Sequence, residues 1–295
     1  MNVSDMEKVY KVLSIAGSDP SGGAGIQADI KAITSLGGYA ATAITALTVQ
    51  NTFGVRSVFA VPPQVVAEQI GAVMEDIRPQ AVKIGMVKDS EIVGVIVDAI
   101  RKYSPQVVVY DPVMVATSGD RLVDDEALQI IEKELIPLST LITPNLREAE
   151  VLLGRRIADW NRGKDLCASA GINESVAQME SGAIELSDKY GTGVLIKGGH
   201  LEDEQMCDVL CVASHLDLSH RLSHFVEKRI LTSNLHGTGC TLSSAIATLC
   251  AKGVVEGSYD LVKAIAQAKQ YVTRAIDAGS HKDIGQGNGP LWHLV

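Results

Sequence analysis

Short apolar runs alternate with longer amphipathic segments along this chain of 295 residues, and this alternation limits the folds open to it. The run Gln106–Tyr110 (QVVVY) is apolar almost throughout, which is typical of a parallel strand buried on both faces. By contrast, Ser90–Arg101 repeats its apolar residues with the spacing of one helical face. Strands that alternate with helices in this way predict βαβ units and a mainly parallel sheet covered by helices.

The positions of the apolar runs and amphipathic segments predict where the strands and helices lie. Strands are expected at residues 9–16, 39–49, 54–61, 81–84, 106–110, 140–142 and 194–196. Helices are expected at residues 25–36, 65–77, 90–101, 125–136, 147–153, 241–251 and 259–278. No Pro/Ser-rich linker divides the chain, so we expect a single α/β domain over residues 1–295. Within it, residues 39–61 are expected to form a small β flap and residues 155–182 a polar surface excursion.

Charge and cysteine content exclude several classes of protein. The formal net charge is −9, which argues against binding to nucleic acid or to an anionic membrane surface. The uncharged stretch between Lys31 and Arg56 is too rich in Thr, Gly, Gln and Asn for a membrane-spanning helix. Five cysteines cannot all pair within one chain, and the apolar run Val12–Gly17 is too short for a signal peptide. We therefore expect a cytoplasmic protein with reduced thiols.

Polar residues follow several of the expected strands, where open parallel sheets bind their ligands. Asp111 follows the strand 106–110, Asn145 and Glu148 follow 140–142, and Lys197 follows 194–196. Carboxylates at strand ends suit Mg²⁺, directly or through water, and a lysine suits the phosphates of ATP. Each of these residues taken alone could equally be a surface charge, so their convergence is the stronger signal.

The first glycine-rich loop resembles a dinucleotide-binding fingerprint but lacks part of it. Gly23, Gly25 and Ala28 match the pattern G-x-G-x-x-[GA]. After Asp29 the next acidic residue is Glu68, so the carboxylate that would hold a ribose about 20 positions on is absent. No Gly-Lys-[Ser/Thr] follows either, as a P-loop would require. These gaps disfavour an NAD-dependent dehydrogenase.

A second glycine turn, Gly237-Thr238-Gly239-Cys240, runs directly into the helix expected at 241–251. A helix N-terminus offers unpaired N–H groups and a partial positive charge, and glycines let an anion approach the backbone closely. The turn is therefore a candidate anion hole for a phosphoryl group in transfer. At this terminus the thiol of Cys240 is expected to have a lowered pKa, which suits a proton acceptor or nucleophile. Similar turns also precede helices that bind nothing.

Taken together, the motifs resemble a known family of kinases. The segments AGSDPSGGAGIQADIK, ITALTVQNT, KIGM, DPVMVATSG, LITPNLREAE, KGGH and HGTGCTLSSAIA are similar to those of hydroxymethylpyrimidine/phosphomethylpyrimidine kinases, in the same order. The resemblance runs from about Val12 to the helix that follows residue 259. It implies the ribokinase-like fold, a three-layer αβα sandwich around a mostly parallel sheet.

The resemblance also implies an activity and a set of site residues. The activity is ATP- and Mg²⁺-dependent phosphorylation of 4-amino-5-hydroxymethyl-2-methylpyrimidine, and then of its monophosphate, in thiamine biosynthesis. Residues matching the family's pyrimidine contacts are Gly17, Asp29, Gln50, Met86 and Val113. Residues matching its phosphoryl-transfer and nucleotide contacts are Gly237, Thr238, Gly239, Cys240, Lys197 and Asn145, with Asp111 and Glu148 for the metal. A homodimer is implied as well.

One position separates this chain from the sugar kinases of the same superfamily. Those enzymes carry Asp as general base at the last position of the glycine turn, whereas this chain and the pyrimidine kinases have Cys, here Cys240. A pyridoxal kinase remains the nearest alternative, because its substrate is another heteroaromatic hydroxymethyl compound. A vitamin sensor without turnover is a further alternative, but it would be expected to lose the glycine turn, Asp111 or Lys197.

Overall fold

The computed structural model describes residues 8–114, 123–157, 174–199, 205–213 and 221–295. Within these residues the strands form one nine-stranded sheet in the order β3-β2-β1-β4-β5-β6-β7-β8-β9. The strands are β1 (Lys11–Ser18), β2 (Tyr39–Asn51), β3 (Gly54–Ala60), β4 (Ala81–Ile84), β5 (Val107–Tyr110), β6 (Leu141–Ile142), β7 (Gly193–Ile196), β8 (Gln205–Cys211) and β9 (Leu222–Lys228).

Most neighbouring strands are parallel, as the sequence predicts. The pairs β2–β1, β1–β4, β4–β5, β5–β6 and β6–β7 are parallel, and only β3, β8 and β9 join antiparallel. The sequence analysis did not foresee β8 and β9. Strand β8 mixes polar Gln205 and Asp208 with apolar residues, and β9 ends the sheet with one buried position among its seven, so neither gives a continuous or periodic apolar signal.

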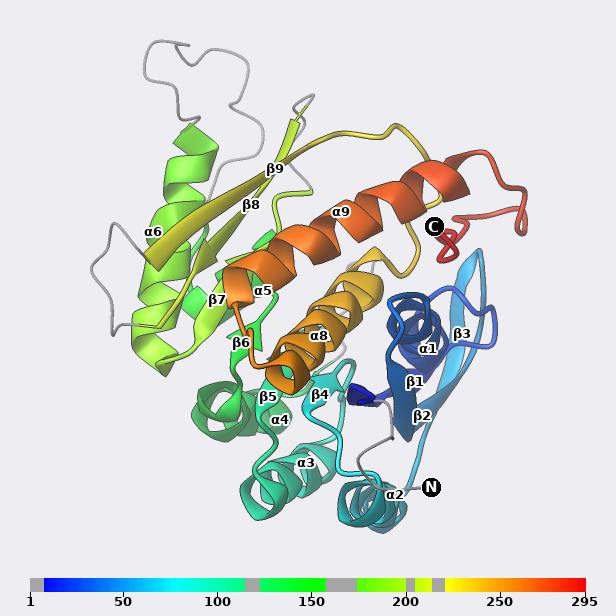
Figure 1. Ribbon diagram of the computed structural model, residues 1–295, viewed down its shortest axis with the longest axis vertical. Coiled ribbons are helices and arrows are strands. Elements are labelled where there is room, and N and C mark those ends of the chain that lie inside the picture. The colour runs from blue at the N-terminus through cyan, green and yellow to red at the C-terminus, as the bar shows by residue number, and fades with distance from the viewer. Residues whose placement is uncertain (1–7, 115–122, 158–173, 200–204, 214–220) are drawn as a thin grey trace.

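Helices cover both faces of the sheet in three layers (Figure 1). They are α1 (Gly25–Ser35), α2 (Pro63–Asp76), α3 (Ser90–Tyr103), α4 (Asp125–Ile130), α5 (Leu146–Leu153), α6 (Glu174–Tyr190), α8 (Thr238–Glu256) and α9 (Leu261–Ser280). One hydrophobic core joins the sheet to α2–α6, and a second core joins it to α1, α8 and α9.

Strand β5 shows why its sequence is apolar throughout. Val108 and Tyr110 belong to the first core, whereas Val107 and Val109 belong to the second. Side chains alternate between the two faces of a strand, so a sheet covered on both faces needs apolar residues at every position. The expected αβα sandwich is therefore confirmed.

The helix expected at 125–136 is shorter and less regular than the pattern suggests. Regular α-helix ends at Ile130, a π-helical turn covers Ile131–Leu135, and a 3-10 turn covers Ile136–Leu138. Pro137 lies in that last turn and has no N–H to continue the helical ladder, so the helix cannot extend past it.

The expected β flap at residues 39–61 and the expected surface excursion at residues 155–182 can be compared with the structure. The first part of β2 pairs with β1 inside the main sheet, and its second part pairs only with β3 in a hairpin that ends the sheet. Of the surface excursion expected at 155–182, residues 158–173 lie outside the described residues, and its last part begins α6.

Helix α8 passes a length-and-composition test for a membrane span, alone among the helices within the described ranges. In the fold it is a core helix, since 56% of its most apolar window is buried inside the protein. It packs against α9, α1 and strands β5, β4 and β1. Its apolar composition is explained by this packing.

The sheet order places a crevice beside β1. Strand β2 lies on one side of β1 and β4 on the other, so the chain changes direction across the sheet at this point. In open α/β sheets ligands bind outside the carboxyl ends of the strands at such a reversal. The candidate site is therefore sought where β1, β4, β5 and β7 end.

Candidate active site

A buried group of charges lies where β5, β6 and β7 end. Lys197 Nζ is 2.8 Å from Asp111 Oδ1, and the hydroxyl of Thr143 donates to the same oxygen at 3.0 Å. Asp111 and Glu148 are almost fully buried. Burial raises the pKa of Asp111, but the positive charges of Lys197 and Lys83 lower it by more. The pKa of Asp111 therefore lies below its ordinary value. Asp111 and Lys197 are therefore a charged pair.

Glu148 is held in place by the first turn of α5. Its side chain accepts a hydrogen bond from Asn145 N at 2.7 Å, while the Asn145 side chain accepts one from Glu148 N at 3.0 Å. This reciprocal arrangement is a capping box. Burial, together with the charge of Asp111, raises the pKa of Glu148 to about 7 even though Lys197 opposes the change. The Asn145 oxygen is thus engaged in the cap.

These two carboxylates suit a divalent cation chemically. Mg²⁺ is usually bound by one or two carboxylates together with water and substrate phosphates. The raised pKa of Glu148 reflects buried negative charge that Lys197 only partly balances. A further positive charge beside Glu148 would relieve that imbalance, so the residues present fit the metal that the family resemblance implies.

The N-terminus of α8 lies beside this group. Gly239 is so close that a Cβ built on it would lie 3.3 Å from Asp111 Oδ2 and 3.4 Å from Lys197 Nζ. Gly237 is the N-cap, with φ +83°, and no side chain caps the helix. A Cβ on Gly237 would lie 1.8 Å from the carbonyl oxygen of Gly23, so only glycine fits there. The first turn of α8, with Thr238, Gly239 and Cys240, therefore faces the charged pair.

A second buried ion pair lies beneath Cys240. Lys83 Nζ lies 2.9 Å and 2.8 Å from the two carboxylate oxygens of Asp29, and both side chains are fully buried. Ser14 and Ser244 donate hydrogen bonds to the same carboxylate at 2.5 Å and 2.7 Å. These contacts surround Asp29, which the resemblance assigns to the pyrimidine. In the structure Asp29 is fully buried, and its hydrogen bonds connect α1 to β1, β4 and α8.

Lys83 is a buried residue beside the site that received no role from the sequence. A signal for it exists, because Lys83 is the one charged residue in the strand Ala81–Ile84, whose four residues are all buried. A lysine at such a position needs a buried carboxylate partner. The partner, Asp29, could not be identified without the fold, since 54 residues separate the two.

The expected lowering of the Cys240 pKa is wrong. Burial raises the pKa of the Cys240 thiol to about 11, and the carboxylates of Asp29 and Asp111 add to that rise. Lys83 and a backbone hydrogen bond from Gly25 act in the opposite direction but do not compensate. The helix terminus alone suggested a reactive thiolate. The protein packed around the half-buried thiol, together with the two carboxylates, outweighs it.

The other residues assigned to the pyrimidine lie along the edge of the crevice. A Cβ on Gly17 would lie 3.0 Å from Met86 Cε, so the Gly17 backbone and the Met86 side chain are in contact. Gln50 lies on β2, and its Nε2 is 3.0 Å from Nε2 of His236, the residue before the glycine turn. Val113 lies two residues after Asp111 and donates its N–H to the Asp111 carbonyl. The structure thus brings Gln50 next to the N-terminus of α8.

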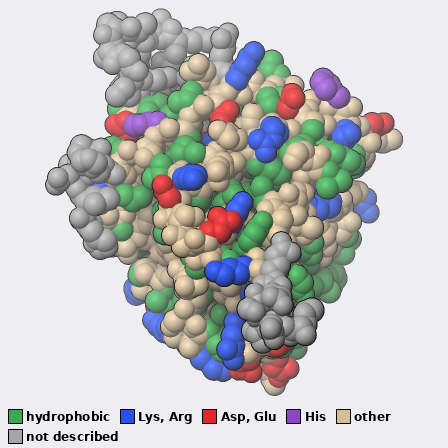
Figure 2. Space-filling view, viewed as in Figure 1, with side chains coloured by type: hydrophobic (Ala, Val, Ile, Leu, Met, Phe, Trp, Pro, Cys, Tyr) green, Lys and Arg blue, Asp and Glu red, His purple; other side chains and the backbone are tan. Residues whose placement is uncertain are grey.

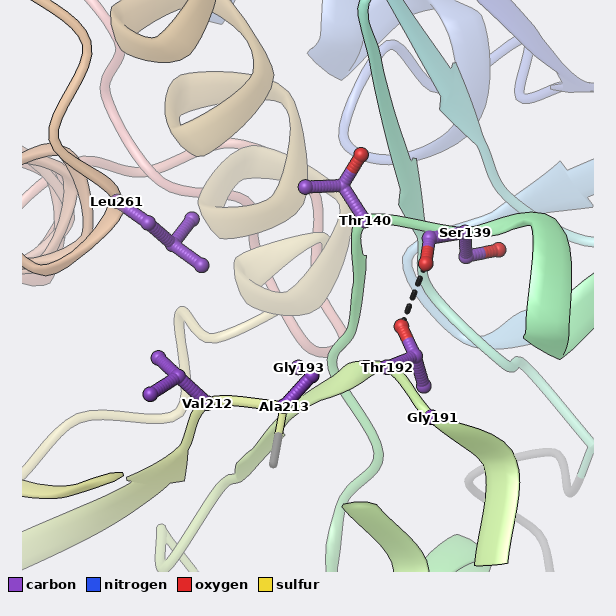
Figure 3. Close-up of a pocket in the computed structure, with 8 residues that line it drawn as sticks. All are labelled: Ser139, Thr140, Gly191, Thr192, Gly193, Val212, Ala213 and Leu261. Atoms are coloured by element: carbon purple, nitrogen blue, oxygen red, sulfur yellow. Dashed lines mark hydrogen bonds between the residues drawn. The ribbon is translucent and has the colours of Figure 1, made fainter. Parts of the chain in front are cut away.

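A cavity elsewhere in the fold does not belong to this site. It has a volume of about 290 Å³ and is lined by Ser139, Thr140, Gly191, Thr192, Gly193, Val212, Ala213 and Leu261 (Figure 3). Thr140 precedes β6 and Gly193 begins β7, so the cavity lies at the amino ends of these strands. Asp111 and Lys197 lie at the opposite, carboxyl ends.

Comparisons with known proteins find relatives along almost the whole chain. A family model described as phosphomethylpyrimidine kinase matches residues 19–292. A hydroxymethylpyrimidine/phosphomethylpyrimidine kinase of Rhizobium meliloti is 44% identical over 282 residues, which cover 96% of each chain. The thiamine biosynthesis bifunctional protein ThiED of Geobacter sulfurreducens is 43% identical over 284 residues, 96% of this chain and 52% of that protein.

A solved structure supports the fold independently. The ADP complex of Bacillus subtilis pyridoxal kinase matches with a TM-score of 0.80 and 31% identity, over 97% of this chain and 98% of that one. Its fold is the ribokinase-like sandwich expected from the motifs. The family model matches almost the whole length of the chain. The chain belongs to the phosphomethylpyrimidine kinase family.

Proposed function

We propose that this protein uses ATP to phosphorylate the hydroxymethyl oxygen of 4-amino-5-hydroxymethyl-2-methylpyrimidine, and then phosphorylates the monophosphate again, for thiamine biosynthesis. The observation that carries the proposal is the approach of the Asp111–Lys197 pair to Gly239 at the N-terminus of α8. Names of relatives with 43% and 44% identity support the same substrates and pathway.

The geometry supplies what phosphoryl transfer needs, which is position and positive charge more than covalent chemistry. Backbone N–H groups at the start of α8 would face the oxygens of the migrating phosphoryl group. Lys197 keeps its proton because Asp111 and Glu148 raise its pKa against the effect of burial, so it would offer a cation to the ATP phosphates. Cys240, one residue further along α8, would accept the proton of the substrate hydroxyl.

Asp111 and Glu148 would hold Mg²⁺, with Asn145 keeping Glu148 in place. The ion would neutralise charge on the β- and γ-phosphates of ATP. Lys197 would remain paired with Asp111, so the carboxylate keeps a fixed orientation while it serves the metal.

Phosphorylation of pyridoxal is a second candidate activity. The specific observation in its favour is the likeness to the pyridoxal kinase of B. subtilis at 31% identity. An ATP-consumption assay against both alcohols, with mass spectrometry of the products, tests the two activities together. We expect a pyrimidine monophosphate and diphosphate, with a higher kcat/KM for the pyrimidine than for pyridoxal. Absence of any phosphorylated pyrimidine would contradict the proposed function.

Gln50→Ala is expected chiefly to raise the KM for the pyrimidine. An amide offers a donor and an acceptor, which match the amino group and the neighbouring ring nitrogen of an aminopyrimidine. Losing both bonds should raise this KM by about tenfold or more, while the KM for ATP changes little. Steady-state kinetics with each substrate varied in turn measures the effect. An unchanged pyrimidine KM would remove Gln50 from the substrate site.

We further propose that the protein forms a homodimer through the β2–β3 hairpin. Strand β3 ends the sheet, and its free edge can pair with another chain. Hydrophobic side chains gather at the edge of the molecule where β3 lies (Figure 2). The exposed ones on this hairpin are Leu47, Val49, Phe53, Val55, Val58 and Phe59, and Tyr39 is exposed at the start of β2. Exposed apolar patches of this kind mark protein interfaces.

Phe59→Glu is expected to convert the dimer to a monomer. Phe59 is 61% exposed and pairs with Leu47 across the hairpin, so a charge there would be desolvated in the interface. Light scattering at working concentration measures the mass. Val226→Glu, on the exposed part of β9 at the opposite edge of the sheet, is the matched control and should leave the mass unchanged. A wild-type protein of monomeric mass would contradict the dimer.

The proposed location is the cytoplasm. The support for it is the composition, with thiols that cannot all pair, and the buried, unpaired state of Cys207, Cys211 and Cys250 in the fold.

A further inference from the structure

A chain of three polar side chains joins the first glycine-rich loop to the substrate-facing strand. Asp19 follows β1, His236 precedes the glycine turn, and Gln50 lies on β2. His236 Nε2 is 2.8 Å from Asp19 Oδ2 and 3.0 Å from Gln50 Nε2. No function described so far uses Asp19 or His236, although both lie beside the site.

Asp19 is a fixed anion. Its carboxylate accepts hydrogen bonds from Ser21 N at 2.8 Å, Ser21 Oγ at 2.7 Å, Gly23 N at 3.2 Å and Ala24 N at 2.8 Å. Burial raises the pKa of Asp19, but the bonds from His236, Ser21 and Ala24 together lower it to about 2. An ionised carboxylate only accepts hydrogen bonds, so His236 Nε2 must carry the hydrogen that points to Asp19.

The position of the His236 ring is fixed by packing as well. A Cβ on Gly23 would lie 2.4 Å from His236 Cδ2 and 3.0 Å from the Cβ of Pro290. The backbone N–H of His236 donates to Gly289 O at 3.1 Å. The ring therefore sits in a slot between the first glycine-rich loop and the C-terminal segment, and cannot turn its other nitrogen toward Gln50 without moving both.

These neighbours determine the orientation of the Gln50 amide. A protonated Nε2 of His236 cannot accept from the amide NH₂, so the amide oxygen must face His236. On the other side, Gln50 Oε1 lies 3.2 Å from Thr48 Oγ1, whose single hydrogen goes to Ser18 O at 2.8 Å. A half-turn of the amide removes both conflicts: its NH₂ then donates to Thr48, and its oxygen faces the single Nε2 hydrogen of His236 and shares it with Asp19 in a three-centre bond.

We propose that His236, oriented by Asp19, is a positioning residue that fixes the amide of Gln50 in this rotated orientation and so selects the donor–acceptor order of the substrate's ring edge. A 4-aminopyrimidine presents a donor beside an acceptor, whereas a 4-oxopyrimidine protonated on the adjacent nitrogen presents the reverse. A fixed amide discriminates between them, since the wrong edge would leave polar groups unpaired. A freely rotating amide accommodates both.

This inference rests on the proposed contact between Gln50 and the pyrimidine, and the experiment separates the two. His236→Phe keeps an aromatic ring of similar size and removes the donor, and His236→Gln returns an N–H. His224→Phe is the matched control, a histidine on β9 that contacts Glu180 away from the site. For each variant, kcat/KM is measured with the aminopyrimidine and with its 4-oxo analogue, and KM for ATP is measured alongside.

His236→Phe is expected to raise the KM for the aminopyrimidine about tenfold and to lower the preference for amino over oxo by a similar factor. The KM for ATP should change by less than about threefold, and His236→Gln should restore much of the preference. Thr48→Val, which removes the other partner of the amide, should lower the preference too and serves if His236→Phe does not fold. The His224 variant should match the wild type.

The outcomes are distinguishable. If Gln50→Ala raises the pyrimidine KM but neither His236→Phe nor Thr48→Val changes the preference, the positioning role is overturned and the proposed function stands. If Gln50→Ala leaves the pyrimidine KM unchanged, the substrate site itself is wrong and the inference falls with it. Equal losses with both ring edges and with ATP would show a structural role only, and would also overturn the proposal.

Discussion

Cys240→Ala is expected to lower kcat by about 10²–10⁴, the range typical of a removed general base. In the fold Cys240 lies in the first turn of α8, next to Gly239 and the Asp111–Lys197 pair, where the substrate hydroxyl would receive the phosphoryl group. Alanine keeps the helix and removes only the thiol. The KM values for ATP and the pyrimidine should change much less than kcat, because proton transfer matters in the transition state and not in binding.

The raised pKa of Cys240 gives this prediction a pH signature. The thiolate is the basic form, and with a pKa of about 11 its fraction falls about tenfold for each pH unit below that value. Wild-type kcat should therefore rise with pH across the neutral and mildly alkaline range. The Ala variant should lose that dependence, and pH profiles of kcat for both proteins measure it.

Cys250→Ala is the matched control for Cys240→Ala. Cys250 lies on the same helix, is buried, and has a pKa of about 12 through burial, but it faces the second core and Tyr259. Its variant should retain the wild-type kcat and pH profile, with some loss of stability. Turnover near the wild-type value in Cys240→Ala, at any pH, would reject Cys240 as the base.

Lys83→Met is expected to destabilise the fold by about 3–5 kcal/mol, the usual cost of removing one partner from a buried ion pair. Met fills the space of the lysine stem, but Asp29 would remain buried without its cation. The hydroxyls of Ser14 and Ser244 would still donate to Asp29, yet they carry no charge. Urea unfolding followed by circular dichroism measures the loss as a lower midpoint with an unchanged slope.

Two comparisons sharpen the Lys83 test. The double variant Lys83→Met/Asp29→Asn removes both charges and should be more stable than Lys83→Met alone, because no unpaired charge remains buried. Lys102→Met removes the exposed pair between Lys102 and Glu75, and should change stability far less than Lys83→Met does. A loss of under about 1 kcal/mol in Lys83→Met would contradict the structural importance of this pair.

Lys83 also connects stability to chemistry. Its charge lowers the pKa of Cys240 against the effect of burial. Lys83→Met should therefore raise that pKa further and move the rise of kcat to higher pH. This shift distinguishes an electrostatic effect on Cys240 from a general loss of folded enzyme, which would lower kcat equally at all pH values.

Elements with continuous or strictly periodic apolar patterns were predicted well from sequence. Strand β4 matches its expected range, and β5 and α3 match within about two residues. Strand β9, which ends the sheet, and its neighbour β8 were missed because the exposed positions of β9 and the mixed sequence of β8 leave little periodic signal. The π-helical and 3-10 turns before β6 were missed because residues 131–136 continue the helical spacing of apolar residues, although the regular α-helix already ends at Ile130.

For the site, the sequence supplied the residue types and the fold supplied their neighbours. Gly237 and Gly239 indicated from sequence that another group lies close to the backbone of this turn. In the structure these groups are Gly23 beside Gly237, and Asp111 and Lys197 beside Gly239. The identity of Asp29's partner, the role of His236 and the direction of the Cys240 pKa could not be read in this way. Each depends on atoms that are distant in sequence.

The sequence by itself determined the layered α/β architecture and the family, because hydrophobic periodicity and motif order are local properties of the chain. Only the tertiary structure decided which charges are buried together, in which direction the pKa of Cys240 moves and which side chains surround the Gln50 amide. Electrostatic energies depend on distance and on exclusion of water, and both are set when β1, β4, β5, β7 and α8 pack around one crevice.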